Sequence, residues 1–288
     1  MKSSYKKFAI VILKIAVSVS ALYFVFSKIQ FSQIFILYKN IEISWLILAG
    51  LAFIISKFIA ALRLNRFFKI IGIQLEEIQN IKLYLLGMFY NLFLPGGIGG
   101  DGYKIYILNK KSEVKAKKIF WAILTDRLNG VLALFSLSIL LLYFFNLELV
   151  TNYRIYLWIL IPLGIFFFYF FILKLANYLA GVLVKTTILS FLVQISQLLS
   201  AFFILKSLGV KDSEVQYLFV FLISSIVAML PVSIGGMGLR ELTFLYGSKF
   251  LFLNEESSIA ISLLFYLITA FVSLWGIYFS IKTKKIGI

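Results

Sequence analysis

Two glycine-rich segments hold the residue types that could bind a ligand. Leu94–Lys104 and Leu230–Arg240 both read L-P-x-x-I-G-G-x-G-x-[KR], 136 residues apart, and two of the three prolines in the chain occupy the same place in this pattern. Proline breaks a helix, and a helix that restarts beyond the break presents free N–H groups at the positive end of its dipole. We expect such restarts near Gly100–Lys104 and Gly236–Arg240. Two helix starts with Lys104 and Arg240 nearby would suit a phosphate group.

A structural role is the alternative for these segments. The glycines would then only let helices approach closely, with the two cations facing headgroup water. The duplication favours the binding site. Gly97–Gly102 also fits G-x-G-x-x-G, but no strand precedes it and the second copy has Ser233 at the first glycine. A dinucleotide site is therefore not expected.

Three carboxylates fall at plausible membrane depth: Asp101, Asp126 and Glu241. Burial raises the pKa of a carboxylate, so one of them could carry a proton if transport is proton-coupled. Alternatively, each neutralises a neighbouring cation such as Lys104 or Arg240. The sequence leaves both roles open.

Cations also occur within the apolar segments. Asp126 and Arg127 are adjacent on an expected helix, so they should seek different partners, either in a functional site or in an ion pair near the cytoplasmic edge. Lys14 lies close enough to a helix end to reach the interface with its long side chain. Lys57 could do the same or could line a cavity.

Composition defines the class of protein. Of 288 residues, 62% are hydrophobic and 14% are charged, which predicts an all-α integral membrane protein. The chain has no cysteine and no histidine, which excludes disulfides, thiolate and imidazole catalysis and metal sites built from these residues, and no cofactor is expected. The net charge of +16 is spread along one membrane face, so nucleic acid is not an expected partner.

Six apolar runs are long enough to cross a bilayer: Phe8–Phe26, Trp45–Leu62, Ile119–Phe145, Ile155–Leu173, Thr187–Leu205 and Ser258–Ile281. Two shorter runs, Leu83–Leu94 and Val215–Leu230, lead directly into the glycine-rich motifs. These are too short to cross upright.

The lysines and arginines predict the topology. Alternate connecting stretches carry 18 and 6 of them, which puts the richer set and both termini on the cytoplasmic side of the cytoplasmic membrane. Each motif must then be the tip of a re-entrant hairpin, and the two hairpins must enter from opposite faces. Applying the 136-residue offset to the first half brings its spans near those of the second. We therefore expect one membrane domain, 1–288, built as an inverted repeat with halves of about 1–146 and 147–288.

The motif pair, with Asp126-Arg127 between its two copies, resembles the flippase-like membrane domain of the lysylphosphatidylglycerol synthetase family. The resemblance covers nearly the whole chain, and we expect a stand-alone member without the soluble synthetase domain. It implies a lipid translocase that moves an anionic or aminoacylated phospholipid, or a lipid-linked glycan, between leaflets. The family pattern is met by Pro95, Gly96, Gly97, Gly99, Gly100, Asp101, Asp126, Arg127, Pro231, Gly235, Gly236, Gly238, Arg240 and Glu241.

Two other functions remain open at this stage. The chain could be an enzyme of lipid aminoacylation or glycosyl transfer, with Asp101 or Asp126 as the base, although no donor-binding lobe is recognisable. It could also be a membrane subunit that scaffolds a lipid synthase or glycosyltransferase. The expected partner is a membrane lipid, and the oligomeric state is left open.

Overall fold

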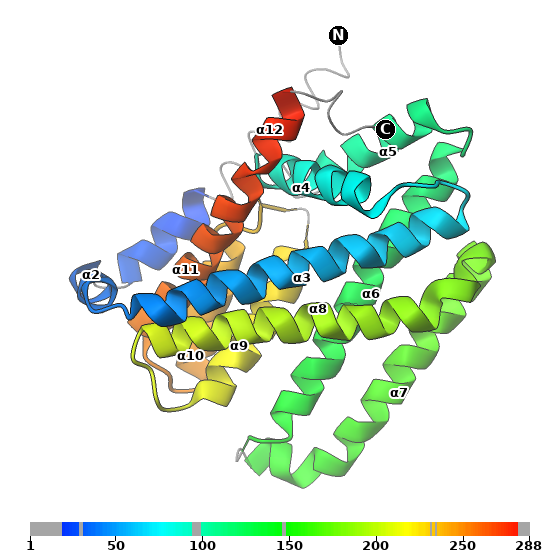
Figure 1. Ribbon diagram of the computed structural model, residues 1–288. Coiled ribbons are helices and arrows are strands. Elements are labelled where there is room, and N and C mark those ends of the chain that lie inside the picture. The colour runs from blue at the N-terminus through cyan, green and yellow to red at the C-terminus, as the bar shows by residue number, and fades with distance from the viewer. Residues whose placement is uncertain are drawn as a thin grey trace.

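A computed structural model describes residues 19–28, 31–93, 99–145, 148–230, 232–233 and 235–281 of the chain. Within these residues the structure is helical and contains no strand (Figure 1). Most of the expected span Phe8–Phe26 lies outside them. So do the motif residues Pro95, Gly96, Gly97 and Pro231.

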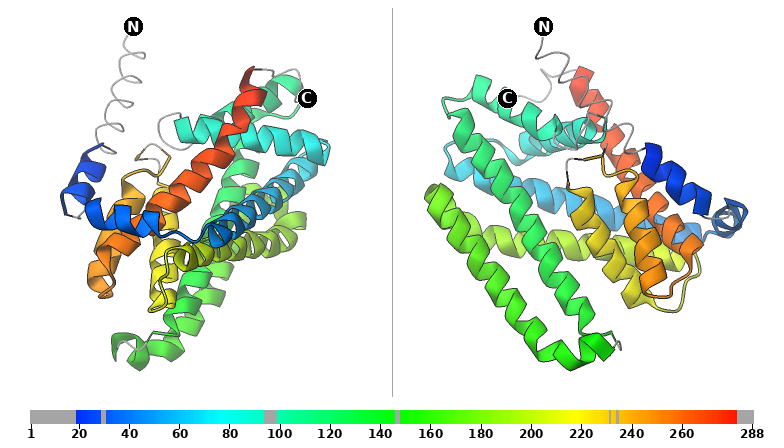
Figure 2. Two further views of the ribbon diagram at one scale, coloured as in Figure 1. Left: turned by 60° about the vertical axis from the view of Figure 1, so that its left-hand side comes forward. Right: turned by 180° about the vertical axis from the view of Figure 1, so that it is seen from behind.

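Two long antiparallel helices, α3 (Ile43–Ile70) and α8 (Ala180–Ser207), lie side by side through the molecule (Figures 1 and 2). Ser200 Oγ donates a hydrogen bond to the Ala49 carbonyl at 2.8 Å, and Arg63 Nη1 donates to Ser190 Oγ at 2.8 Å. Small residues such as Ala49 and Ser200 allow this close packing, because apolar helices in a membrane associate through tight contact and hydrogen bonds.

The remaining long helices fall where the apolar runs predict spans. They are α6 (Ala116–Leu142), α7 (Glu148–Ala176), which reaches α8 through the 3-10 turn η1 (Asn177–Leu179), and α11 (Glu255–Leu274), which continues into α12 (Gly276–Ile281). Among the described residues, four helical segments are long and apolar enough to cross a membrane, and one of them, Ile155–Ser207, is 53 residues long and contains most of α7 and all of α8. A short helix, α2 (Phe31–Lys39), precedes α3. The total of six spans stays a prediction.

Each glycine-rich motif joins two short helices that pack against each other. The first hairpin is α4 (Glu77–Phe93) with α5 (Gly99–Lys111), and the second is α9 (Glu214–Ala228) with α10 (Leu239–Phe250). Helix α5 begins close to the expected restart. Helix α10 begins later than the expected Gly236, because Gly235, Gly236 and Gly238 have φ of 58°, 83° and 85°, which a right-handed helix cannot contain.

The turn into each hairpin is built in the same way. Gly72 and Gly209 have φ of 94° and 72°, and each ends its preceding helix with the hydrogen bonds of a Schellman motif. A lysine–glutamate ion pair spans each turn, Lys69–Glu77 at 2.7 Å and Lys206–Glu214 at 2.5 Å. The helix order α3, α4, α5, α6 is thus repeated as α8, α9, α10, α11. The opposite membrane orientation of the two halves stays a prediction.

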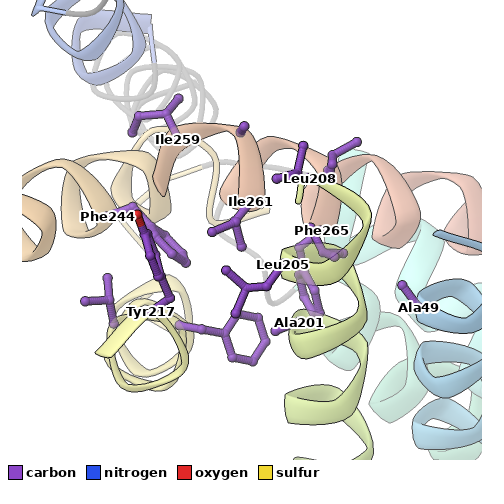
Figure 3. Close-up of a cluster of buried hydrophobic side chains, with 14 of the residues drawn as sticks. Ala49, Ala201, Leu205, Leu208, Tyr217, Phe244, Ile259, Ile261 and Phe265 are labelled. Atoms are coloured by element: carbon purple, nitrogen blue, oxygen red, sulfur yellow. The ribbon is translucent and has the colours of Figure 1, made fainter. Parts of the chain in front are cut away.

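Two separate hydrophobic clusters hold the hairpins. One joins α9, α10 and α11 to one end of the α3–α8 pair and includes Tyr217, Phe244 and Phe265 (Figure 3). The other joins α4, α5 and the start of α6 to the opposite end and includes Leu86 and Leu108. The hairpins are therefore anchored at opposite ends of the same helix pair, and their tips point toward the middle.

We predict that Gly100→Ala destabilises the first hairpin. A Cβ at Gly100 would collide with the Gly87 carbonyl on α4, so the helices would have to separate at a cost of about 1–3 kcal/mol. The matched control is Gly102→Ala on the same helix, where a Cβ meets no atom within 4 Å and alanine favours the helix. Thermal unfolding in detergent should give a lower Tm for Gly100→Ala only. Equal Tm values for the two variants would contradict the close packing.

Candidate functional site

A cavity of about 300 Å³ lies between the two hairpin tips. The first hairpin contributes Asn91, Asp101 and Lys104 to its lining, and the second contributes Ser225 and Arg240. The long helices α3, α6, α8 and α11 supply the remaining walls. The volume is at the lower end for a small-molecule site, so the cavity suits a small ligand.

The two hairpin tips touch at the edge of this cavity. A Cβ placed on Gly235 would lie 3.2 Å from Leu92 Cδ1 and 3.4 Å from the Leu92 carbonyl oxygen. Because Gly235 also has positive φ, a glycine serves two purposes here: it permits the backbone turn and the close approach. The two copies of the motif, far apart in sequence, therefore form a single site.

Two buried carboxylates organise the cations on one side of the cavity. Asp126 receives two hydrogen bonds from the Arg63 guanidinium, at 2.7 and 2.9 Å. Asp101 forms ion pairs with Arg127 and with Lys104, whose Nζ is 3.2 Å away. The neighbours Asp126 and Arg127 thus pair with different partners, as their adjacent positions on α6 predict. Asp101 neutralises Lys104, which is one of the two roles left open by the sequence.

Lys104 is buried deep in the site. It is only 4% exposed, and its ammonium lies 4.9 Å from the centre of the Tyr84 ring. It does not face headgroup water as the structural alternative requires. That alternative is nevertheless right about Gly100, which packs against α4 and whose N–H already donates to Asn91 Oδ1 at 2.8 Å. This N–H is not available to an anion.

Two further cations line the cavity without a carboxylate partner among the described residues. The Arg240 guanidinium lies 4.8 Å from the Phe265 ring and 5.6 Å from the Phe221 ring, and its buried Nη1 has no hydrogen-bond partner there. The Lys57 ammonium lies 4.3 Å from the Phe53 ring. The aromatic faces stabilise these charges only in part.

The charges of the lining do not balance. Five cations face the cavity, Lys57, Arg63, Lys104, Arg127 and Arg240, against two carboxylates, Asp101 and Asp126. Uncompensated charge is costly in a low-dielectric environment, so the cavity favours an anion. Gln194 and Gln197 add amide donors to the same lining.

Glu241 has a different role from the one expected beside Arg240. It is 1% exposed and accepts hydrogen bonds from the Gly238 N–H at 2.7 Å and from Ser262 Oγ at 2.8 Å. It therefore caps α10 and ties it to α11. No ion pair with Arg240 is formed.

The motif residues divide into two groups in the described part of the chain. The cavity lining includes Asp101, Lys104, Asp126, Arg127, Gly235 and Arg240. Others shape the hairpin tips without belonging to the lining, namely Gly99, Gly100, Gly236, Gly238 and Glu241.

Arg63 is a site residue that was not expected from the sequence. The expected span ended at Leu62, but α3 continues to Ile70. The signal was present in the sequence, because Leu64, Phe67 and Phe68 carry the apolar pattern past the arginine. All three are buried, and they place Arg63 inside the protein.

These features define a helical integral membrane protein with a cationic cavity between two hairpins. The chain belongs to the family described as the lysylphosphatidylglycerol synthase TM region, which matches residues 11–181 and 173–276. It is also similar to the UPF0104 membrane protein PH1989 of Pyrococcus horikoshii. The two are 24% identical over 291 residues, which cover 81% of this chain and 84% of the relative. The family resemblance inferred from the motifs is thereby confirmed.

We predict that Asp126→Ala destabilises the protein by about 3–5 kcal/mol, because it leaves Arg63 buried without its partner. The double substitution Arg63→Met with Asp126→Leu should recover most of this loss. As a control, Lys69→Ala breaks the partly exposed pair with Glu77 and should cost at most about 1 kcal/mol. Denaturant unfolding in detergent measures all three. A small effect of Asp126→Ala would argue against a buried pair.

Proposed function

We propose that this protein moves a phosphate-bearing lipid between the leaflets of the membrane, with the headgroup bound in the cavity between the hairpin tips. The observation that carries this proposal is the excess of cations around that cavity. Lys57 and Arg240 make no ion pair among the described residues, so they are the side chains best suited to a phosphate group.

Headgroup transfer is the physical problem that such a site solves. A charged headgroup cannot cross hydrocarbon alone, because it would lose its hydration without compensation. A cavity of about 300 Å³ with fixed cations supplies replacement contacts to the headgroup, while the acyl chains stay in lipid. The shared chemistry of the candidate substrates is the phosphate, whether in an anionic phospholipid, an aminoacylated one or a lipid-linked glycan.

The arrangement of the hairpins supports access to the cavity from two sides. The α4–α5 hairpin is attached at one end of the α3–α8 pair and the α9–α10 hairpin at the other. With the lysine-rich connections and both termini in the cytoplasm, the first hairpin would enter from the cytoplasmic face and the second from the outer face. Movement of one tip and then the other would expose the headgroup to each leaflet in turn.

The enzymatic alternative has weaker support. A general base must be free to accept a proton, whereas Asp101 and Asp126 each accept contacts from buried or partly buried cations. Both carboxylates are thus already engaged by cations.

We predict that Arg240→Ala and Lys104→Ala strongly reduce leaflet exchange of a fluorescent phosphatidylglycerol in reconstituted vesicles. The Arg240→Ala variant would lose a direct phosphate contact worth about 1.5–3 kcal/mol. This loss would lower the exchange rate about ten- to a hundredfold. Lys104→Ala would remove one of the two cations paired with Asp101 and so lower the positive charge around the headgroup. Exchange is measured by quenching of the outer-leaflet fluorophore.

The matched control is Lys185→Ala, which removes an exposed cation on α8 outside the cavity lining and should leave exchange unchanged. If both cavity variants fold and exchange lipid at the wild-type rate, the anion site is wrong. If wild-type protein shows no exchange but co-purifies with a lipid synthase or glycosyltransferase, the scaffold function is favoured instead.

A further inference from the structure

A second cavity, apolar and of about 250 Å³, lies beside the cationic one. Its walls come from α3, α4 and the end of α11, and include Ile54, Ile81, Leu85 and Val272. Apart from Lys57, the Tyr84 hydroxyl and the Trp275 indole N–H, the described side chains that line it are apolar. We call this second cavity the side groove.

The side groove adjoins the cationic cavity. Lys57 and Tyr84 line both of them. The Tyr84 ring carries the Lys104 ammonium 4.9 Å from its centre, so this ring stands between a cationic surface and an apolar one. The boundary has the polarity pattern of an amphiphile, with charge on one side and hydrocarbon on the other.

The outer edge of the side groove faces away from the protein core. Phe58, Phe271 and Trp275 line it and are 48%, 66% and 65% exposed. They belong to helices α3 and α11 or directly follow α11, and both helices lie in candidate membrane spans. Large apolar side chains exposed at that depth contact lipid, so the groove opens sideways toward the bilayer.

We propose that the side groove holds part of an acyl chain of the same lipid whose headgroup occupies the cationic cavity. Lys57 lies at the junction of the two cavities and is positioned to contact the phosphate where headgroup and glycerol meet. The lipid enters laterally between α3, α4 and α11. The inference rests on the proposed headgroup site and adds to it the entry route and the recognition of the chain.

The charge of one cavity and the apolar surface of its neighbour favour a lipid chain over other occupants. A free anion would use the cationic cavity alone and would gain nothing from an adjoining apolar groove. A transmembrane helix of another protein would place apolar side chains against Lys57, which has no ion pair among the described residues. An anionic lipid satisfies both surfaces at once.

The test uses substitutions that place a large side chain in the side groove from either of two walls, each with a matched control. Ile81→Trp on α4 and Ile54→Trp on α3 each place a large ring in the groove. Ile78→Trp and Ile55→Trp make the same change at exposed positions of the same helices, 64% and 54% exposed, that are outside its lining. Binding of phosphatidylglycerol is measured by native mass spectrometry, and binding of glycerophosphoglycerol, the same headgroup without chains, is measured by calorimetry.

The groove variants should bind phosphatidylglycerol about tenfold more weakly or worse. A loss of this size corresponds to roughly two methylene groups that are no longer buried. Their affinity for glycerophosphoglycerol should stay within about twofold of wild type, and the two control variants should bind both probes normally. Wild-type phosphatidylglycerol affinity in both groove variants would overturn the inference and leave the headgroup site intact. Failure of wild-type protein to bind either probe would instead overturn the headgroup site itself.

Discussion

The cost of burying charge is the constraint on which this structure depends. Five cations and two carboxylates surround one cavity at the meeting point of two hairpins. Both carboxylates form ion pairs, Asp126 with Arg63 and Asp101 with Lys104 and Arg127. Lys57 and Arg240 make no ion pair among the described residues, and aromatic rings face both side chains. A site with this imbalance favours an anion.

The α3–α8 pair is the frame that makes such a site possible. Packing along most of their length and hydrogen bonds at two levels hold these helices together across the two halves of the chain. Each hairpin is bound to one end of this frame by its own hydrophobic cluster. The hairpins meet each other mainly at their tips, where Gly235 lies against Leu92.

The repeat is close in local structure and unequal in chemistry. The two turns share a positive-φ glycine, Gly72 or Gly209, and a lysine–glutamate pair. The hairpin tips differ, because Asp101 in the first motif lies in the cavity lining, whereas Met237 takes its place in the second. As a result Lys104 is neutralised and Arg240 is not. The second hairpin supplies Arg240, which has no ion pair among the described residues. The first hairpin supplies Asp101 and its ion pair with Lys104.

The sequence by itself determined the membrane class, the five described long helices, the two hairpins and the family, because apolar run length and duplicated helix-breaking residues are local signals. It also indicated that Asp126 and Arg127 have separate partners. Only the tertiary structure decided which partners these are, that Arg63 belongs to the site, that Glu241 caps a helix and that Gly100 serves packing. Those outcomes depend on contacts between residues far apart in the chain, such as Arg63 with Asp126, and on backbone angles, and neither is encoded in local periodicity.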